Sequence, residues 1–299
     1  MSDRTEKHVG ICPLCQTEQD LIQSHAIPAG VFRSLLKGAN GAPPYSISAL
    51  KTLITSRQYQ DFVFCQPCDN LFNTNGEDWI QRQMWRPRGF PLLEKLADAV
   101  PVEEFRDGYV FETAGIPGID STKLAYFAVT MMWRMSIHAW LGADGDRRRF
   151  NLGPYQEPMR RFLFGVGPFP DNVVVSVYVW PDKARVLTAT YLPKPEETYP
   201  HHSYSYYLPG VTFVLNAGRQ MPPVMRRLCC YRGRGNPICT SAKAVAGSIR
   251  FVRNISKNES GDDAEHARQW ASMESQSDCD WFKVLRHRFR ETTAAPPNC

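Results

Sequence analysis

Two short cysteine pairs decide the fold of the first part of this chain: Cys12-Pro13-Leu14-Cys15 and Cys65-Gln66-Pro67-Cys68. In each pair, two residues separate the cysteines, so that one tight turn aims both sulfurs at the same metal ion. Four thiolates suit the tetrahedral geometry of structural zinc, and a shared ion would staple two distant segments together. The alternatives are four unrelated buried cysteines or a redox role, although neither pair lies in a strand-to-helix βαβ context.

The composition of the whole chain is that of an ordinary globular protein. Hydrophobic residues make up 43% and charged residues 22% of 299 residues, which excludes wholesale disorder and is enough for a sizeable core without disulfides. The formal charge of +5 is compatible with a polyanionic partner but does not require one. Arg134 and His138 interrupt the most apolar stretch, so it does not form a clean membrane span. The amino terminus has no apolar core of the kind that a secretory signal needs. We therefore expect a cytoplasmic protein that does not bind membranes and keeps its thiols reduced.

Three regions can be distinguished along the chain. Residues 1–100 form a zinc-knuckle module, in which apolar residues after the second cysteine pair recur at helical spacing. Gly76 weakens this helix, and Pro87 should end it. Residues 101–218 combine helices with antiparallel strands. Residues 219–299 are irregular and basic, with a linker at 258–263 and a short terminal helix at 281–290.

The middle region predicts two helices followed by a meander of strands. The first helix spans 121–141 and begins with a plausible serine cap at Ser121, and the second covers 155–163. From 101 to 165 the pattern is mainly helical. β-Branched and aromatic runs within 172–216, separated by Pro, Asp and His, then predict an antiparallel β meander.

The segment between the cysteine pairs contains Ser24-His25-Ala26-Ile27-Pro28, and here the chain resembles the HNH endonuclease family. The resemblance implies an α+β protein whose amino-terminal part is a zinc-stapled ββα, treble-clef-like module. It also implies that His25 is the general base that activates water, beside a divalent ion such as Mg²⁺ or Mn²⁺ that neutralises the scissile phosphate. The alternative for His25 is a core or supporting histidine that holds the zinc loop.

The chain departs from the family pattern around this histidine. Ser24 stands where the family usually has a metal-binding acid, and Gln60 or Asp61 stands in the region of an expected asparagine. Three residues after the second cysteine pair could supply the missing ligands: Asp69, Asn73 and Glu77. Their four-residue spacing puts them on one helical face, where oxygen ligands suit Mg²⁺ or Mn²⁺. Equally, they could form a solvated helix face.

The resemblance extends more loosely to about residue 165. A helix that carries Trp133 and Arg134, followed by a short helix with further arginines, is similar to a pattern in an uncharacterised family of bacterial HNH-like proteins. Because an unpaired buried guanidinium is costly, Arg134 needs an acceptor, and a structural ion pair is favoured over a phosphate contact.

Arginine clusters are a second indication of a polyanionic partner. Arginine suits bidentate phosphate contacts, and the alternative for each cluster is a solvated surface. The candidate nucleic-acid-binding residues are Arg147, Arg148, Arg149, Arg226, Arg227, Arg232 and Arg234. Further along, Cys229, Cys230 and Cys239 are expected to be buried free thiols, and His201-His202 is expected to form an exposed turn.

The leading hypothesis is a metal-dependent HNH-type endonuclease that holds a structural zinc ion and acts on nucleic acid, with DNA favoured over RNA. The resemblance alone implies a bacterial setting such as anti-phage defence or mobile-element biology. One alternative is a catalytically degenerate module that binds nucleic acid or protein. Another is a purely structural zinc staple, with the function in residues 101–299. The sequence does not indicate an oligomeric state.

Overall fold

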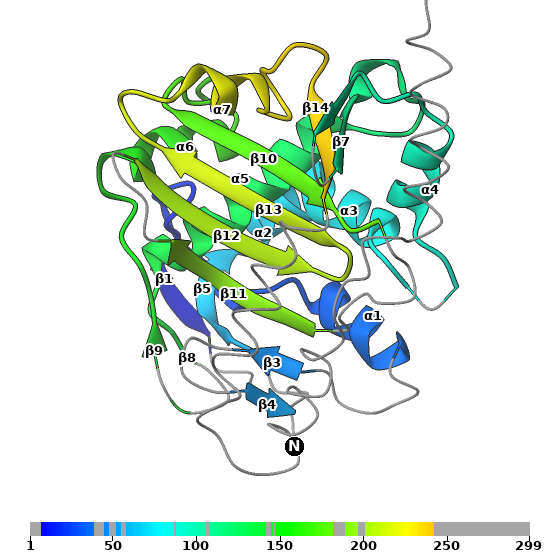
Figure 1. Ribbon diagram of the computed structural model, residues 1–299. Coiled ribbons are helices and arrows are strands. Elements are labelled where there is room, and N and C mark those ends of the chain that lie inside the picture. Colours follow the sequence, from blue (N-terminus) through cyan, green and yellow to red (C-terminus); the bar gives the residue numbers. More distant parts are fainter. Residues whose placement is uncertain are drawn as a thin grey trace, which may run out of the picture.

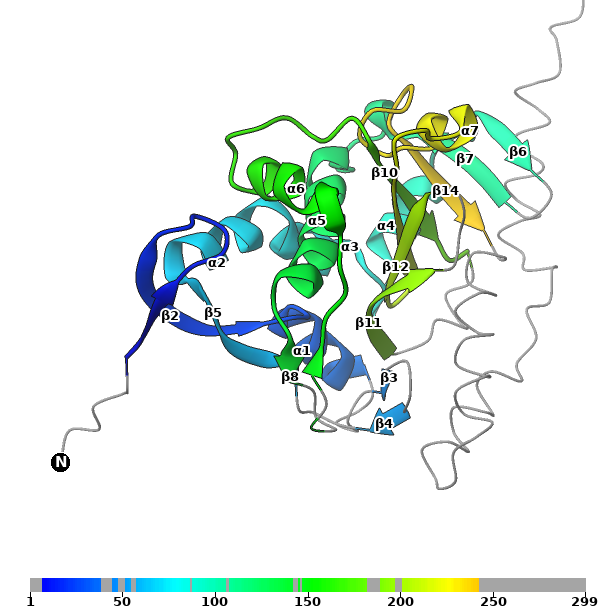
Figure 2. The same cartoon turned by 90° about the vertical axis from the view of Figure 1, so that its left-hand side faces the viewer.

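The computed structural model describes residues 7–38, 45–47, 52–54, 58–86, 88–105, 108–141, 145, 147–181, 189–196 and 201–241. The chain is a mixed α+β protein with a three-stranded sheet, a nine-stranded sheet and a two-stranded ribbon. A central helix, α5 (Ser121–Ile137), lies between the two larger sheets (Figures 1 and 2). This general class agrees with the sequence prediction.

The three-stranded sheet carries both cysteine pairs. It is antiparallel in the order β1 (His8–Ile11), β2 (Glu18–His25) and β5 (Gln60–Cys65). The first cysteine pair lies in the turn between β1 and β2. Helix α2 (Gln66–Phe72) follows β5 directly, and Pro67 lies in its first turn, where the missing N–H costs nothing. The second cysteine pair therefore spans the junction between a strand and a helix.

The helix after β5 contains a π-helical turn. α2 continues into η1 (Asn73–Glu77) and then into α3 (Asp78–Gln83). Within this turn the N–H of Asp78 donates to the carbonyl oxygen of Asn73, five residues earlier. Gly76 lies in the turn and packs directly against the backbone of α5. Gly76, which was predicted to weaken the helix, thus lies where two helices approach closely. The helix ends at Gln83, before Pro87, as expected.

The nine-stranded sheet draws strands from all three sequence regions. Its order is β4-β3-β11-β12-β13-β10-β14-β7-β6, with parallel pairing only between β3 and β11 and between β10 and β14. Its strands are β3 (Tyr45–Ile47), β4 (Thr52–Ile54), β6 (Glu103–Phe105), β7 (Gly108–Glu112), β10 (Val173–Val179), β11 (Ala189–Glu196), β12 (His202–Leu208), β13 (Val211–Ala217) and β14 (Pro237–Ser241).

The strand order corrects two predictions. The strands from β10 to β13 pair with one another in antiparallel fashion as expected, but β10 pairs with β13 rather than with β11, so the order is of Greek-key type and not a meander. A tight turn at Gly210, with φ +80°, joins β12 to β13, whereas β10 ends at Val179 and β11 begins only at Ala189. The mainly helical prediction for 101–165 was wrong for β6 and β7, which lie at the sheet edge.

Helix α5 is buried on all sides. Residues 124–136 are all buried, because η1 packs on one side of the helix and the nine-stranded sheet on another. Arg134 is the only charged residue in this run. The helix differs from its prediction at both ends. The Asp120 side chain, rather than the serine after it, accepts the Lys123 N–H at 3.0 Å, and the helix ends at Ile137.

The remaining elements surround this framework. The helix predicted at 155–163 is confirmed as α6, whereas the predicted linker and terminal helix lie outside the described residues. Among the helices that the structure describes, none has the length and apolar character to cross a membrane. The other elements are α1 (Ala29–Gly38), α4 (Pro91–Ala97), η2 (Thr113–Gly115), β8 (Trp140–Leu141), β9 (Arg147–Arg148), η3 (Gly153–Tyr155), α6 (Gln156–Leu163) and α7 (Pro223–Arg227).

Candidate metal centre and histidine site

Four cysteine side chains meet at one end of the three-stranded sheet. The sulfurs of Cys12, Cys15, Cys65 and Cys68 all lie within 4.8 Å of one another, and the Cys15 and Cys65 sulfurs are 3.9 Å apart. A tetrahedral zinc ion with bonds of about 2.3 Å holds its sulfurs roughly 3.8 Å apart. The four cysteines are free of disulfides, and three are buried. This donor set fits a structural metal such as zinc, as the spacing of the cysteines predicted.

Local backbone geometry forms the first half of this cluster. The N–H of Cys12 donates to the Thr17 carbonyl at 3.0 Å, and the N–H of Gln16 donates to the Cys12 carbonyl at 2.8 Å. Gln16 adopts the left-handed region with φ 60°, which closes the tight turn. A distant helix also holds this turn, because Arg160 Nη1 of α6 donates to the Leu14 carbonyl at 2.7 Å.

The sulfurs also influence one another's protonation. A hydrogen bond with Cys68 lowers the pKa of the Cys12 thiol to about 4. The same hydrogen bond, together with burial, raises the pKa of Cys68, and burial raises that of Cys65. Of these three thiols, Cys12 therefore loses its proton most readily. A divalent ion would stabilise the charged form of all four sulfurs, which is the form that binds zinc.

His25 lies at the end of β2, opposite Gln60 at the start of β5. Its side chain is half-buried, and burial lowers the pKa of its imidazole. The charge of Asp69 raises that pKa, while the charges of Arg134 and Arg33 lower it. Because Asp69 follows Cys68 in the first turn of α2, the metal cluster fixes its position relative to β2. The fold thereby brings together a neutral imidazole and a partly exposed carboxylate.

Arg134 reaches this place from α5 and links several elements. Its Nη2 atom lies 2.7 Å from Glu77 Oε1 and 3.9 Å from Asp69 Oδ1. Its Nη1 atom donates to the His25 carbonyl oxygen at 3.2 Å, and its guanidinium carbon lies 4.3 Å from the centre of the Phe72 ring. The side chain of Arg134 is only 2% exposed. The predicted structural ion pair is therefore confirmed, with Glu77 as the close partner.

The three candidate ligands of a catalytic ion do not share one environment. Asp69 is 31% exposed and Asn73 is exposed, but Glu77 is buried and faces Arg134. The expectation of a common face fails at Glu77 because the π turn changes the phase of the helix after Phe72. Over the described residues, the four cysteines are the only group of three or more His, Cys, Asp or Glu side chains close enough to share an ion.

The first arginine cluster lies beside the strand that pairs with β2. Arg147 and Arg148 form β9, and Arg147 Nη1 lies 3.4 Å from Asp61 Oδ2 of β5. The side chain of Arg147 nonetheless remains 54% exposed. Arg149 donates from Nε to the Ser136 carbonyl at 2.8 Å. These arginines therefore have protein partners but also present positive charge at the surface.

The second arginine cluster lies around α7 and the loop after it. Arg227 forms an ion pair of 3.0 Å with Glu103, and Arg232 forms one with Asp171. Arg226 contributes weaker hydrogen bonds to main-chain oxygens, and Arg234 is exposed. Acidic side chains thus offset part of the charge that the sequence pattern suggested for this cluster.

One pair of side chains near the site was not predicted. His138 Nε2 lies 3.0 Å from Asp61 Oδ2, and Asp61 lies directly opposite Ser24, the residue before His25, in the pairing of β2 with β5. Burial raises the pKa of Asp61, but hydrogen bonds from His138, Arg147 and the Phe62 N–H outweigh it and lower the pKa overall. In the sequence His138 only interrupts an apolar run, so nothing there indicates that it meets Asp61.

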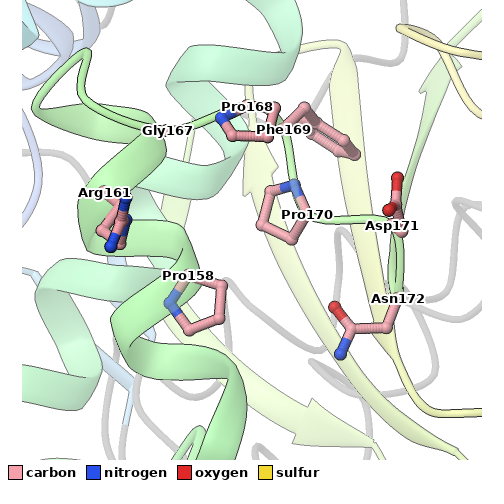
Figure 3. Close-up of a pocket in the computed structure, with 8 residues that line it drawn as sticks. All are labelled: Pro158, Arg161, Gly167, Pro168, Phe169, Pro170, Asp171 and Asn172. Carbon is pink, nitrogen blue, oxygen red and sulfur yellow. The ribbon is translucent and has the colours of Figure 1, made fainter.

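A pocket of about 530 Å³ opens between α6 and the loop that leads to β10 (Figure 3). Its walls are mainly apolar, with one arginine, one aspartate and one asparagine at its margin. No sequence pattern indicated this pocket, because proline-rich loops are common without ligands. Its lining residues are Pro158, Arg161, Gly167, Pro168, Phe169, Pro170, Asp171 and Asn172.

The prediction of buried free thiols is confirmed, whereas the prediction of an exposed turn at His201-His202 needs a correction. Three cysteines predicted to be free thiols are buried and unbridged: Cys229, Cys230 and Cys239. His201, expected in an exposed turn, is instead 6% exposed, because it packs beneath the residues that follow β13. Its neighbour His202 is exposed, as expected, with its ring 6.1 Å from that of Tyr155.

Comparisons with protein-family models, with curated proteins and with solved structures find no match to this chain. The side chains themselves are therefore the source of functional information. They comprise a cysteine cluster that can hold a metal, a half-buried histidine, a partly exposed carboxylate and a buried arginine that contacts both of their elements.

Proposed function

We propose that this chain is an HNH-type endonuclease that hydrolyses phosphodiester bonds in nucleic acid with the help of a divalent ion. The observation that carries the proposal is the order of β2, β5 and α2, which sets His25 at a strand end close to Asp69 on the helix. The cysteine cluster ties these elements together at the other end of the same strand pairing, where Cys65 lies opposite Leu21. Two antiparallel strands followed by a helix is the arrangement that the HNH resemblance implies.

The site residues have properties that suit this chemistry. His25 is half-buried with a lowered pKa, so that near neutral pH its imidazole is available to take a proton from water. The Asp69 carboxylate and the exposed Asn73 amide offer the oxygen ligands that Mg²⁺ or Mn²⁺ accepts, with substrate and water completing the shell. A bound ion of this kind would neutralise the scissile phosphate and stabilise the departing oxygen.

Positive charge lies beside this site. The exposed part of Arg147 and its neighbours on β9 lies next to β5, whose partner β2 carries His25. Guanidinium groups there can contact the phosphates that flank a scissile bond. The cluster around α7 gives weaker support, since Glu103 and Asp171 already pair with its arginines. DNA is favoured over RNA on the HNH resemblance alone.

A nuclease assay with a histidine control tests the proposal. The zinc-loaded full chain is incubated with supercoiled plasmid, linear duplex, single-stranded DNA and RNA in Mg²⁺, Mn²⁺ or Ni²⁺. His25→Ala should abolish cleavage with zinc content and fold intact, whereas His202→Ala, which changes an exposed histidine on β12, should cleave like wild type. Folded, zinc-containing wild type that cleaves none of these substrates would contradict the proposal.

A second candidate is a nucleic-acid-binding protein without catalysis. The observation in its favour is the poor ligand set, because Ser24 replaces an acid and Glu77 is engaged with Arg134. In this case wild type and His25→Ala would bind DNA equally well and neither would cleave it. The affinity would fall steeply with salt concentration, since phosphate contacts release counterions.

A further inference from the structure

Around Arg134 the charges do not cancel. One guanidinium, 2% exposed, faces two carboxylates: Glu77 at 2.7 Å and Asp69 at 3.9 Å. Glu77 is buried, whereas Asp69 is 31% exposed. Burial raises the pKa of Glu77, but the nearby Arg134 guanidinium lowers it. With Glu77 ionised, one positive charge faces two negative charges, and the closer carboxylate takes most of it. The uncompensated negative charge remains on Asp69, the carboxylate that solvent can reach.

We propose that Glu77 is a positioning residue that holds Arg134 away from Asp69 and so leaves the Asp69 carboxylate able to bind a divalent cation. The inference rests on the proposed function, because the cation is the ion of the proposed reaction. Glu77, which the sequence suggested as a ligand of that ion, acts instead through Arg134.

The structure leaves Arg134 little freedom except between these two carboxylates. Its Nη1 atom is held by the His25 carbonyl, and its guanidinium lies against the Phe72 ring at 4.3 Å. At 3.9 Å, Nη2 is at the outer limit of an ion pair with Asp69, and a small rotation about these contacts would bring it to hydrogen-bond distance from that carboxylate. The attraction of Glu77 at 2.7 Å opposes that rotation.

The π turn makes this competition possible. It changes the helical phase between Phe72 and Asp78, so that Glu77 turns inward toward α5 while Asp69 and Asn73 stay on the exposed side. A guanidinium in direct contact with Asp69 would cancel its charge and occupy its oxygens, and both effects weaken cation binding. With Glu77 ionised, the two carboxylates divide into an inner partner of Arg134 and an outer cation ligand.

The test measures Mn²⁺ affinity directly, by the electron paramagnetic resonance signal of free Mn²⁺ over the zinc-loaded full chain. Asp69→Asn should remove the site. Glu77→Gln keeps the size of the side chain but releases Arg134 to Asp69, and we expect Mn²⁺ binding about tenfold weaker. Glu77→Gln combined with Arg134→Met also removes the competing guanidinium, so Mn²⁺ affinity should return to the wild-type value or above it. Asp78→Asn, an exposed neighbour, is the matched control and should change nothing.

The order of affinities separates positioning from simple structural support. If Glu77 merely stabilised the fold, the double variant would bind Mn²⁺ as weakly as the single variant or more weakly, and that result would overturn the inference. Wild type without an Asp69-dependent Mn²⁺ site would also overturn it. Neither result depends on cleavage, so a failure of the nuclease assay counts against the proposed reaction while the affinity series still decides the role of Glu77.

Discussion

The cysteine cluster and the group around Arg134 lie next to each other on α2 but are specified in different ways. Each half of the cysteine cluster comes from a four-residue motif, and a turn or a helix start aims both of its sulfurs. The group around Arg134 joins residues 25, 69, 77 and 134, and its geometry depends on a π turn and on the packing of α5. Short-range spacing thus encodes the first site, whereas tertiary packing alone creates the second.

Loss of the metal should have the largest effect, because the cysteine cluster ties β1, β2 and α2 together. We expect Cys68→Ser to abolish zinc binding and to lower the free energy of unfolding by more than about 4 kcal/mol. Metal analysis and urea denaturation measure the two changes. Cys229→Ala alters a buried thiol that lies outside the cluster and should keep one zinc ion per chain, at a cost of about 1 kcal/mol. Equal losses in the two variants would remove the distinction between the sites.

Removal of the buried guanidinium should come next. Arg134→Met leaves Glu77 buried without its partner, and we expect the free energy of unfolding to fall by about 3–5 kcal/mol. The double change with Glu77→Gln removes the buried charge as well and should recover most of this loss. Urea denaturation of the two variants gives the comparison. A double variant no more stable than Arg134→Met would show that the ion pair is not the source of the loss.

A glycine substitution tests the contact that sets the second site. A Cβ atom on Gly76 would lie 3.0–3.1 Å from Cβ, Cα and N of Phe127, so η1 and α5 must separate. We expect Gly76→Ala to cost about 1–3 kcal/mol and to weaken the contacts of Arg134, while the zinc content stays the same. Gly115→Ala is the control, because nothing lies within 4 Å of its added Cβ. Thermal unfolding measures the loss of stability and metal analysis measures the zinc content. A Gly76→Ala variant as stable as Gly115→Ala would contradict the close contact between η1 and α5.

The smallest expected effect is on the titration of His25. Burial lowers the pKa of its imidazole below the ordinary value of about 6.5, and the charge of Asp69 partly offsets this. Stability from neutral His25 is therefore present above about pH 6.5 and is lost as the pH falls toward the folded-state pKa. Asp69→Asn should lower the His25 pKa further, because it removes the charge that raises this pKa, and Asp78→Asn should not. Nuclear magnetic resonance of the imidazole protons follows both variants, and a pKa that rises in Asp69→Asn would contradict the assigned interaction.

Much of the local structure could be predicted from sequence because its causes are local. The cysteine spacing predicted the metal cluster, apolar periodicity predicted most of α5 and all of α6, and β-branched runs predicted the strands from β10 to β13. The need of a buried guanidinium for an acceptor predicted the ion pair of Arg134, although not its partner. These inferences use only chain stereochemistry and the cost of burying charge.

The remaining features depend on contacts between distant residues. β10 pairs with β13 rather than with β11. Alternating hydrophobicity marks each segment as a strand but carries no information on which strand lies beside it. Glu77 was misplaced because four-residue spacing assumes a continuous α-helix, and no residue type marks a π turn. The Asp61–His138 pair links positions 77 residues apart and has no local pattern.

The short strand β3 makes part of the amino-terminal region depend on a much later part of the chain for its folding. It comes from the segment between His25 and β5, yet it pairs in parallel with β11, matching Tyr45 with Ala189. The first hundred residues are therefore not an independent unit that could be transferred intact to another protein, since the strand β3 within them belongs to the nine-stranded sheet. A pairing of such long range forms late and slowly. In a newly made chain, β3 can therefore find its partner only after most of the length has left the ribosome, whereas all four cysteines of the cluster are available much earlier.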